Sequence, residues 1–364
     1  LVEDKLAARF SVRNNRHDGY FDNIADPNGK RLNWQEATVI RPSFRITPTD
    51  NLTADLIFEY GKEISGIPAT QYISDPAILA SGLGYLPPSD PQVVNQDNFS
   101  GNNTVEWENV IAEVNWSIGK GTITSVTAYR DTETQVEATD QDGTPLGILY
   151  TDRRADLVNP GYIQDQFSQE LRYAADLHGQ VDLTAGLFYF TQNAQAKERT
   201  NLDLFGITVV DNGFIDHETV GAFIQGDIDL TDNLVTTLGV RYTEETKDIR
   251  FSLRNTCDLN FAGCAFFEDD KSWENVSFKV GLQWRIEESM QAYTSFSRGF
   301  RSGGFNIRGG AAIAGFISYD EENVDAFEVG FKSELFDERL RLNLAAFLNQ
   351  YEDLQRTVID PSQV

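Results

Sequence analysis

Long segments in which apolar and polar residues alternate are the feature that most limits how this chain can fold. In LRLNLAAFLNQYEDL the even-numbered positions from Leu340 to Leu348 are apolar and share one face of an extended strand, while the odd-numbered positions share the other. The same period of two recurs in VSFKVGLQWR, NLVTTLGVRYT and QVDLTAGLFYF. We count about thirteen such segments of roughly 10 to 16 residues, whereas strands of soluble proteins average about 5 to 6 residues. This length and pattern are typical of tilted strands that span a membrane as a barrel.

The connections between these segments are sorted by length. Short turns are expected near residues 47–51, 119–121, 178–180, 231–233, 287–289 and 336–339. Long polar stretches are expected at 14–33, 61–104, 137–160, 201–212, 255–271 and 303–321. Short and long connections alternate without exception, so an up-and-down barrel would carry every short turn at one end and every long loop at the other. The sequence therefore predicts an all-β, antiparallel, up-and-down transmembrane β-barrel with short periplasmic turns and long extracellular loops.

Composition excludes several other classes. The 364 residues include 56 acidic and 30 basic ones, a net charge of -26, which argues against a nucleic-acid partner because phosphate binding depends on Lys and Arg. Disorder is also disfavoured, since the chain has 24 Phe, 13 Tyr and 5 Trp. No apolar run approaches the ~18 residues of a membrane helix.

The two cysteines stand close together in CDLNFAGC. Cys257 and Cys264 fit a small disulfide loop in an oxidising compartment. Zinc binding is the alternative, but no further Cys or His lies nearby to complete four ligands. We expect the disulfide.

Charged residues on the mixed faces of the strands are candidates for the barrel interior. They are Arg41, Arg45, Glu170, Arg172, Arg241, Lys279, Arg285, Glu328 and Lys332. Charges of both signs in one enclosed space usually neutralise one another across neighbouring strands, and that is the expectation here. Aromatic residues inside the long loops are better candidates for contact with a ligand: Tyr72, Tyr85, Phe205, Phe266 and Phe267.

No catalytic or cofactor motif is found. A GxSxG elbow, an HExxH pair and a Walker A loop are all missing, and the three histidines are scattered. DQDG at 140–143 starts like an EF-hand loop but lacks the later ligands. SRGFRSGGFN at 297–306 suggests an anion site, yet it continues a strand into a polar loop and no helical pattern follows. We therefore expect no enzyme activity, no cofactor and no metal site, and expect Arg298 and Arg301 to face opposite sides of one strand.

Several stretches resemble the barrel strands of TonB-dependent outer-membrane receptors, especially those described as siderophore receptors. The resemblance is carried in order by DQFSQELR, LVTTLGVRYTEETKD, YTSFSRGFRSGGFN and ENVDAFEVGFKSELFDERLRLNLAAFLNQYEDLQ. It implies a barrel of about 22 strands filled by a plug domain, of which residues 1–364 would form a part without the plug and without the last strands.

The resemblance also implies a function, localisation and partners. Such a receptor lies in the bacterial outer membrane, contacts lipid and lipopolysaccharide, and is driven by the TonB complex acting through the plug. Its substrate would be an iron–siderophore complex, with haem, cobalamin or a glycan as other options. The loops at 61–104, 201–212 and 255–271 would then contact the substrate.

Two other classes stay open from the sequence. A passive porin or an adhesin would use the same barrel without energised transport. An enzyme barrel would need a Ser/His or Asp/His constellation, and none is found.

Overall fold

The structure, a computed structural model, describes residues 2–26, 29–71, 88–96, 102–136, 139–140, 143–144, 149–151, 161–202, 206–253, 256–305 and 318–356. Within this part of the chain, no helix combines the length and the apolar character that crossing a membrane would need.

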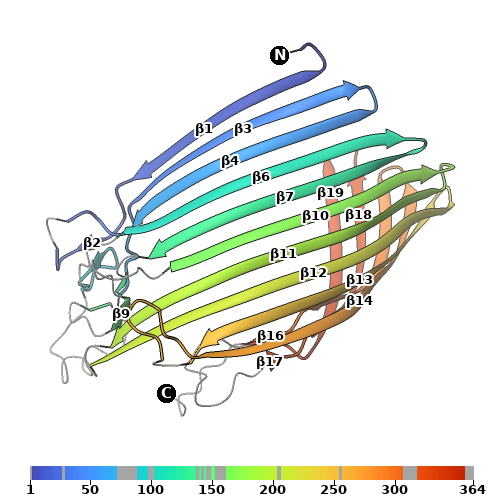
Figure 1. Cartoon of the computed structure of the whole chain (residues 1–364). Helices are drawn as coiled ribbons and strands as arrows, with labels where there is room; N and C mark the ends of the chain where they lie inside the picture. Colours follow the sequence, from blue (N-terminus) through green and yellow to red (C-terminus); the bar gives the residue numbers. More distant parts are fainter. Residues whose placement is uncertain are drawn as a thin grey trace.

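One large antiparallel sheet dominates the structure (Figure 1). In the described residues it has thirteen long strands, which follow one another in sequence order, each paired with the next along the chain. They are β1 (Leu6–His17), β3 (Gln35–Thr49), β4 (Leu52–Gly66), β6 (Asn102–Ile118), β7 (Gly121–Val136), β10 (Gly161–Leu177), β11 (Val181–Leu202), β12 (Ile207–Thr231), β13 (Leu234–Ser252), β14 (Phe266–Glu287), β15 (Met290–Arg301), β18 (Glu322–Leu335) and β19 (Leu340–Glu352). The prediction of an all-β, up-and-down antiparallel sheet of about thirteen strands is confirmed.

Six short strands lie in the described parts of the long connections. β8 (Thr139–Asp140) pairs with β9 (Leu149–Thr151), which joins the sheet at the end of β11. β2 (Asp22–Asn23) runs parallel to β5 (Val93–Val94), and β16 (Gly304–Phe305) pairs with β17 (Ser318–Tyr319). The chain between long strands is therefore partly ordered by contacts between distant segments.

The sheet has two different ends, which we call the turn end and the loop end. At the turn end, connections of only a few residues join β3 to β4, β6 to β7, β10 to β11, β12 to β13, β14 to β15 and β18 to β19. At the loop end lie the described parts of the other connections, such as those around β2, β9 and β16, towards the lower left and bottom of Figure 1. All six predicted short turns lie at the turn end.

Several predicted loops are too long, and the structure corrects them. The stretch 201–212 is mostly strand, because β11 continues to Leu202 and β12 begins at Ile207. The stretch 255–271 is shortened in the same way by β14, which begins at Phe266. Where both faces of a strand are polar, the alternation that marks it in the sequence disappears, but the backbone ladder continues.

Cross-strand register assigns every long-strand residue to one of two faces. Leu340, Leu344 and Leu348 lie on the same face as Phe327, Val329 and Phe331, their partners being Leu335, Phe331 and Phe327. Leu344 is 58% exposed and Leu187 60% exposed, although both are aliphatic. We call this apolar face the outer face and the opposite face the inner face. A continuous exposed apolar surface of this kind suits lipid rather than water.

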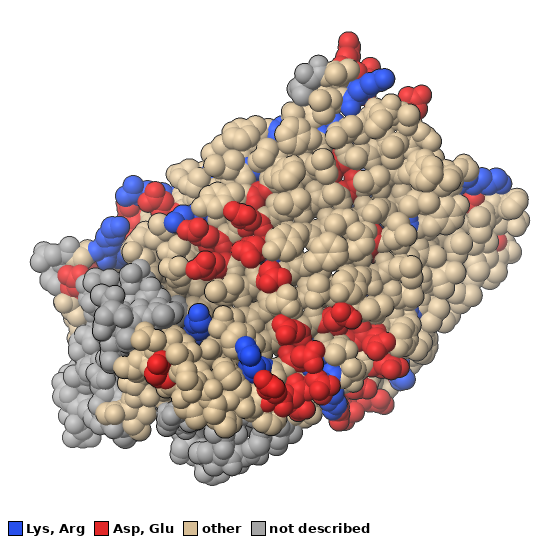
Figure 2. Space-filling model, in the orientation of Figure 1, with Lys and Arg blue, Asp and Glu red and all other residues tan. Residues whose placement is uncertain are grey.

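A row of carboxylates crosses the outer face towards the loop end. Its members lie directly opposite one another on successive strands, with Asn193 in place of an acid on β11: Glu108, Asp131, Asp165, Asp216, Asp248 and Asp270. The Asn193 side-chain amide donates a hydrogen bond to Asp165 at 3.0 Å. Figure 2 shows acidic groups gathered near the loop end beside a broad uncharged surface. Like charges opposite each other need water between them, so this row marks a border of the apolar surface.

Buried hydrophobic clusters occur at the loop end rather than in the middle of the sheet. Leu32, Ile67 and Val94 form one cluster, which ties together the connections around β2 and β5. Ile249, Trp273 and Phe305 form a second cluster between β13, β14 and β16. Among the described residues, the sheet has no apolar core between two layers, as expected for a single curved sheet with one exposed apolar face.

Candidate functional site

The inner face collects the charges that the sequence placed in the barrel interior. One cross-strand row links Arg45, Asp55, Glu113, Val126 and Glu170, so Arg45 and Glu170 share a face. The row continues through Phe188, Gly221, Thr243 and Asn275, and these residues share the face of Arg241 and Lys279. Lys279 lies opposite Ser297, and Ser295 lies opposite Glu328. The structure therefore brings all eight of these charges, Arg41, Arg45, Glu170, Arg172, Arg241, Lys279, Glu328 and Lys332, onto one face.

Some of these charges are paired as a neutralising arrangement. The Arg45 guanidinium donates to both carboxylate oxygens of Asp55, at 2.8 and 2.9 Å. Arg41 Nε lies 3.8 Å from Glu59 Oε2, and Arg172 Nη1 lies 3.5 Å from Glu170 Oε1. Arg285 is similarly 3.5 Å from Asp229. These half-exposed pairs neutralise charge on the inner wall and each contributes little stability.

Glu328 and Lys332 meet through a tyrosine instead of directly. The Tyr293 hydroxyl donates to Glu328 Oε1 at 2.5 Å, and Lys332 Nζ lies 5.5 Å from the centre of the Tyr293 ring. Among the described residues, Arg241 and Lys279 have no carboxylate within ion-pair distance. Neutralisation by cross-strand pairs therefore applies to part of the predicted set only.

A network of polar side chains lies on the inner face near the loop end. Glu245 Oε1 is 3.1 Å from His217 Nε2 and 3.0 Å from Lys247 Nζ, and it accepts a short hydrogen bond from the Ser302 hydroxyl. Lys247 Nζ also donates to the Ser302 hydroxyl at 2.8 Å and to the Gly303 carbonyl at 2.7 Å. The network fastens the segment that follows β15 to the β12–β13 hairpin.

The electrostatics of this network are dominated by its hydrogen bonds. On the outer face of β13 the apolar stretch ends at Tyr242 and Glu244 follows, so Glu245 lies beyond the part that faces lipid. Burial acts to raise the pKa of Glu245, but hydrogen bonds from His217, Ser302 and Lys247 outweigh it and lower the pKa to about 2. Glu245 is therefore ionised throughout the physiological range.

Trp273 supports the network from β14. It is 3% exposed, and its ring packs edge-on against Phe305 with the ring centres 6.2 Å apart. Lys247 and Lys271 lie 5.4 and 5.5 Å from the same ring. A Cβ at Gly303 would lie 2.3 Å from Trp273 Nε1, so only glycine allows this approach. Sequence reasoning missed the role of Trp273, although its odd position in β14 matches the inner-face pattern.

The loop aromatics proposed to contact a ligand fall in different places. Tyr72, Tyr85 and Phe205 lie outside the described residues. Phe266 faces outward, where its ring and that of Phe214 flank the Arg250 guanidinium at 4.9 and 4.1 Å. Phe267 faces inward and packs on the Ile249–Trp273–Phe305 cluster. Phe266 and Phe267 thus lie on opposite faces of β14, and contact of the loop aromatics with a substrate stays a prediction.

The two cysteines form a disulfide that holds a compact loop. The Cys257 and Cys264 sulfurs are 2.06 Å apart. Inside this loop the Leu259 carbonyl accepts a hydrogen bond from Arg199 Nη1 at 2.9 Å, and the Phe261 ring centre lies 5.8 Å from the Arg199 guanidinium. Arg199 is 0% exposed. The loop thus covers the end of β11, an arrangement for which the sequence around Arg199 carries no recognisable signal.

SRGFRSGGFN is a strand end with its two arginines on opposite faces, as expected. Arg298 faces outward and donates two hydrogen bonds of 2.6 Å to the Asp325 carboxylate. Arg301 faces inward and lies opposite Glu322 in the register, whereas Glu328 lies opposite Ser295. The outward arginine is therefore neutralised within the protein.

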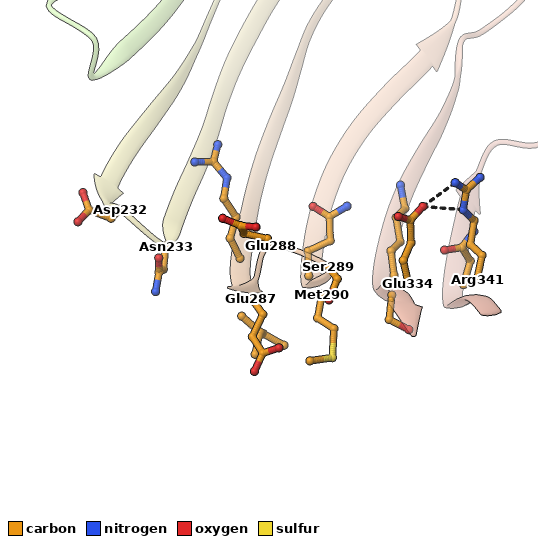
Figure 3. Close-up of a pocket in the computed structure, with 14 residues that line it drawn as sticks. Asp232, Asn233, Glu287, Glu288, Ser289, Met290, Glu334 and Arg341 are labelled. Atoms are coloured by element: carbon orange, nitrogen blue, oxygen red, sulfur yellow. Dashed lines mark hydrogen bonds and ion pairs between the residues drawn. The ribbon is translucent and has the colours of Figure 1, made fainter. Parts of the chain in front are cut away.

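A cavity of about 840 Å³ opens at the turn end between β14, β15, β18 and β19. Figure 3 shows its charged lining, with Glu287 and Glu288 where β14 ends, Glu334 near the end of β18, and Arg341 bonded to Glu334. Arg341 Nη2 and Glu334 Oε1 are 2.5 Å apart. In the described part of the chain, no three His, Cys, Asp or Glu side chains converge as metal ligands. The cavity is thus an open, charged recess beside the turns.

Comparison with known proteins identifies the architecture. Residues 10–364 match the family described as TonB dependent receptor-like, beta-barrel. The sheet is similar to the ferric yersiniabactin uptake receptor FyuA from Yersinia pestis, with a TM-score of 0.78 and 16% identity over 98% of this chain and 51% of that one.

Two further solved structures agree. The ferric-catecholate import receptor Fiu from E. coli K12 gives a TM-score of 0.69 at 13% identity, covering 97% of this chain and 56% of that one. The siderophore receptor PiuA from Acinetobacter baumannii gives 0.70 at 15% identity, covering 95% and 53%. The chain thus spans about half the length of these structures. Together with the family match, this shows that the chain belongs to the TonB-dependent receptor β-barrel family.

Proposed function

We propose that the chain forms part of the wall of an outer-membrane receptor that actively imports a scarce substrate, in the first instance an iron–siderophore complex. Residues 1–364 would supply one part of the barrel, and other segments of the receptor would supply the plug and the remaining strands. Haem, cobalamin and glycans are other substrates within the same proposal. The family match and the siderophore receptors among its structural relatives support the substrate class.

The observation that carries the proposal is the division of each long strand into an apolar outer face and a polar inner face. A strand with exposed leucines on one side and ion pairs on the other fits a wall between lipid and an aqueous or protein-filled lumen. Two layers of a soluble protein would instead bury the apolar side. The inner face is thus the surface along which substrate would pass.

The loop end is proposed as the substrate-capturing end. It holds the connections near 61–104, 201–212 and 255–271, and their bases are fixed by the disulfide, by the buried clusters and by the Glu245 network. Fixed bases reduce the entropy lost when a loop closes on a ligand. Pulling by the TonB complex would then move the plug and open a path along the inner face.

The test uses the full-length receptor in its own host under iron limitation. Uptake of ⁵⁵Fe presented with candidate siderophores is measured in wild-type cells, in cells without the receptor gene and in cells without TonB. The proposal expects uptake that needs both the receptor and TonB. Uptake that needs the receptor but not TonB would indicate a passive porin, and normal uptake of every candidate without the receptor would point to an adhesin or structural role.

Substrate contact by the loops needs its own experiment. Exchanging the segments 61–104, 201–212 and 255–271 with those of a relative that imports a different siderophore should transfer the uptake preference. Exchange of the short turns near 119–121 and 178–180 serves as the control and should leave the preference unchanged. Unaltered preference after the loop exchange would remove these loops from the proposed site.

A further inference from the structure

Arg241 stands in an aromatic slot on the inner face. Its guanidinium carbon lies 5.6 Å from the centres of both the Phe188 and the Phe223 rings. Its Nε donates to the Thr243 hydroxyl at 3.0 Å, which fixes the plane of the group. A Cβ at Gly221 would lie 2.8 Å from Arg241 Nη2, so the missing side chain makes room for the guanidinium. The slot thus holds the Arg241 guanidinium in place. In the described structure, the remaining N–H groups of the guanidinium have no carboxylate partner.

Lys279 is the diagonal neighbour of Arg241 on the next strand. Arg241 lies opposite Ser277, two positions before Lys279 on the same face of β14, and diagonal side chains are roughly 7 to 8 Å apart. Lys279 is exposed on the inner face. No ion pair or hydrogen bond holds its ammonium group within the described residues.

Among the described residues, no immediate inner-face neighbour of this pair is an acid; Asp227, opposite Thr237, and Glu328, opposite Ser295, lie one strand farther away. The inner-face neighbours along and across the strands are Gly221, Phe223, Gln225, Thr237, Gly239, Thr243, Asn275, Ser277, Gly281, Ser295, Ser297 and Gly299. In a chain with a net charge of -26, two adjacent cations with only neutral neighbours are unusual. Other inner-face arginines, such as Arg45, are neutralised by a carboxylate on the next strand. We call Arg241 and Lys279 the inner basic patch.

We infer that the inner basic patch binds a carboxylate or a similar anionic group of whatever occupies the lumen. A guanidinium fixed between two rings is prepared for a bidentate contact, and a flexible ammonium beside it adds a second charge. The anion has two sources with the same chemistry: an acidic side chain of a protein segment that fills the lumen, or an anionic substrate. The inference rests on the proposed function, because that function supplies an occupied lumen.

The test measures how fast Arg241 reacts with phenylglyoxal in the purified full-length receptor, using mass spectrometry of its peptides. Arg339, in the turn between β18 and β19, is the exposed reference within the same molecule. Sodium citrate is the carboxylate probe. Since a hydrogen bond to a charged group corresponds to roughly a tenfold to hundredfold effect, we expect Arg241 to react at least about tenfold more slowly than Arg339 when the anion is bound.

The two sources give different results. Slow reaction without citrate indicates a lumen-filling segment, and slow reaction only with citrate indicates a small anion. In either case Lys279→Gln should speed the reaction of Arg241 several-fold, because the anion is then held less tightly. Lys332→Gln, another inner-face lysine beside Tyr293, should not alter it.

The inference is overturned if Arg241 reacts as fast as Arg339 both with and without citrate. It is also overturned if Arg241 is slow but Lys279→Gln leaves its rate unchanged, because shielding by Phe188 and Phe223 alone would then explain the protection. The phenylglyoxal assay does not depend on transport, so its result is independent of the iron-uptake experiment. A receptor that imports no iron could still show the anion site, and an importing receptor could lack it.

Discussion

At the turn end of the sheet, neighbouring strands are joined by a few residues, and the conformation of each connection is set mainly by its backbone dihedral angles. Gly119, His178 and Gly179 have positive φ angles, as do Phe336, Asp337 and Glu338. At the loop end, order comes from side chains that are far apart in sequence. Gln96 accepts and donates hydrogen bonds around Asn23 and Thr70, and Lys247 reaches Ser302. The difference teaches that one end is defined locally and the other by a few long-range contacts, so single side chains should matter far more at the loop end.

The largest expected effect is the loss of Trp273. Trp273→Ala removes a 3% exposed ring that packs against Phe305 and Gly303, and truncation of a buried Trp costs about 3 to 5 kcal/mol. Amide hydrogen exchange in the detergent-solubilised full-length receptor should be faster in 243–252 and 266–275 by about two to three and a half orders of magnitude, because each tenfold change in exchange corresponds to about 1.4 kcal/mol.

The matched change at the turn end is Phe336→Ala. Phe336 is 73% exposed, so its loss should alter exchange near 335–340 by less than about 0.5 kcal/mol. Trp273→Phe keeps an aromatic ring and should fall between the two. Equal effects of Trp273→Ala and Phe336→Ala would contradict the contrast between the ends.

The disulfide should have the next largest effect. Closing a loop of about eight residues stabilises by roughly 2 to 3 kcal/mol in the chain-entropy description, and here the loop also covers the fully buried Arg199. Cys257→Ser with Cys264→Ser should therefore open the segment 256–265 to proteolysis and speed exchange in 196–202. The strands at the turn end should keep their exchange rates. Unchanged protection of 196–202 would show that Arg199 holds the loop without the covalent bond.

Glu245→Gln is expected to destabilise the loop end by about 1 to 3 kcal/mol, since Lys247 and His217 lose their charged partner. The paired surface carboxylate Glu334, bonded to exposed Arg341, is the control, and Glu334→Gln should cost less than about 1 kcal/mol. The measurement is hydrogen exchange of the segment 243–252 in both variants. Similar losses of stability in the two variants would mean that burial of the Glu245 network does not add to the stability of the loop end.

The same network predicts a dependence on pH. The pKa of Glu245 is lowered to about 2 from an unfolded value near 4.5, so its stabilisation is present above pH 4.5 and is lost as the pH falls towards 2. Wild-type protein should lose protection of 243–252 over this interval, and Glu245→Gln should lose much less. An identical acid profile for the two proteins would assign the acid sensitivity to other carboxylates.

How much of the structure could be predicted from the sequence also differs between the locally defined turn end and the loop end with its long-range contacts. The strands β14 and β19 were predictable from alternation, because an apolar outer face and a polar inner face require residue types to alternate with a period of two. Turns were predictable from short connections such as that at 178–180. The strand ends at Leu202 and Phe266 were not, because the residues beside them, 191–201 and 268–272, are mostly polar on both faces and pairing alone continues the ladder. The contacts of Trp273 and Arg199 depend on segments about 30 and 60 residues away, which no local pattern reports.

The inner face was predictable in one respect only. Parity within each strand placed Arg241, Lys279 and Glu328 together, because register preserves faces across the sheet. Which charges pair depends on the register between neighbouring strands. That register cannot be predicted from the sequence where the length of the connecting loop is uncertain. Arg45 and Asp55 lie on either side of a short turn, so their contact is nearly local. Arg241 lies across from Phe223 and Ser277, and no acid is its direct cross-strand partner in the described sheet.

The smallest effect is expected at the turn end itself, from His178→Asn. His178 and Gly179 are the central residues between β10 and β11, with φ of 65° and 67°. A left-handed backbone is least costly for Gly and is tolerated by Asn better than by most residues, so the substitution should stabilise the turn by a few tenths of a kcal/mol, at most about 1. His178→Val should have the opposite sign, because a branched Cβ crowds the left-handed conformation. Exchange of the amides of 176–182 measures both variants, and neither should alter the loop end. A change in 243–252 after either substitution would show that the two ends are coupled along the strands, which the separate local and long-range contacts argue against.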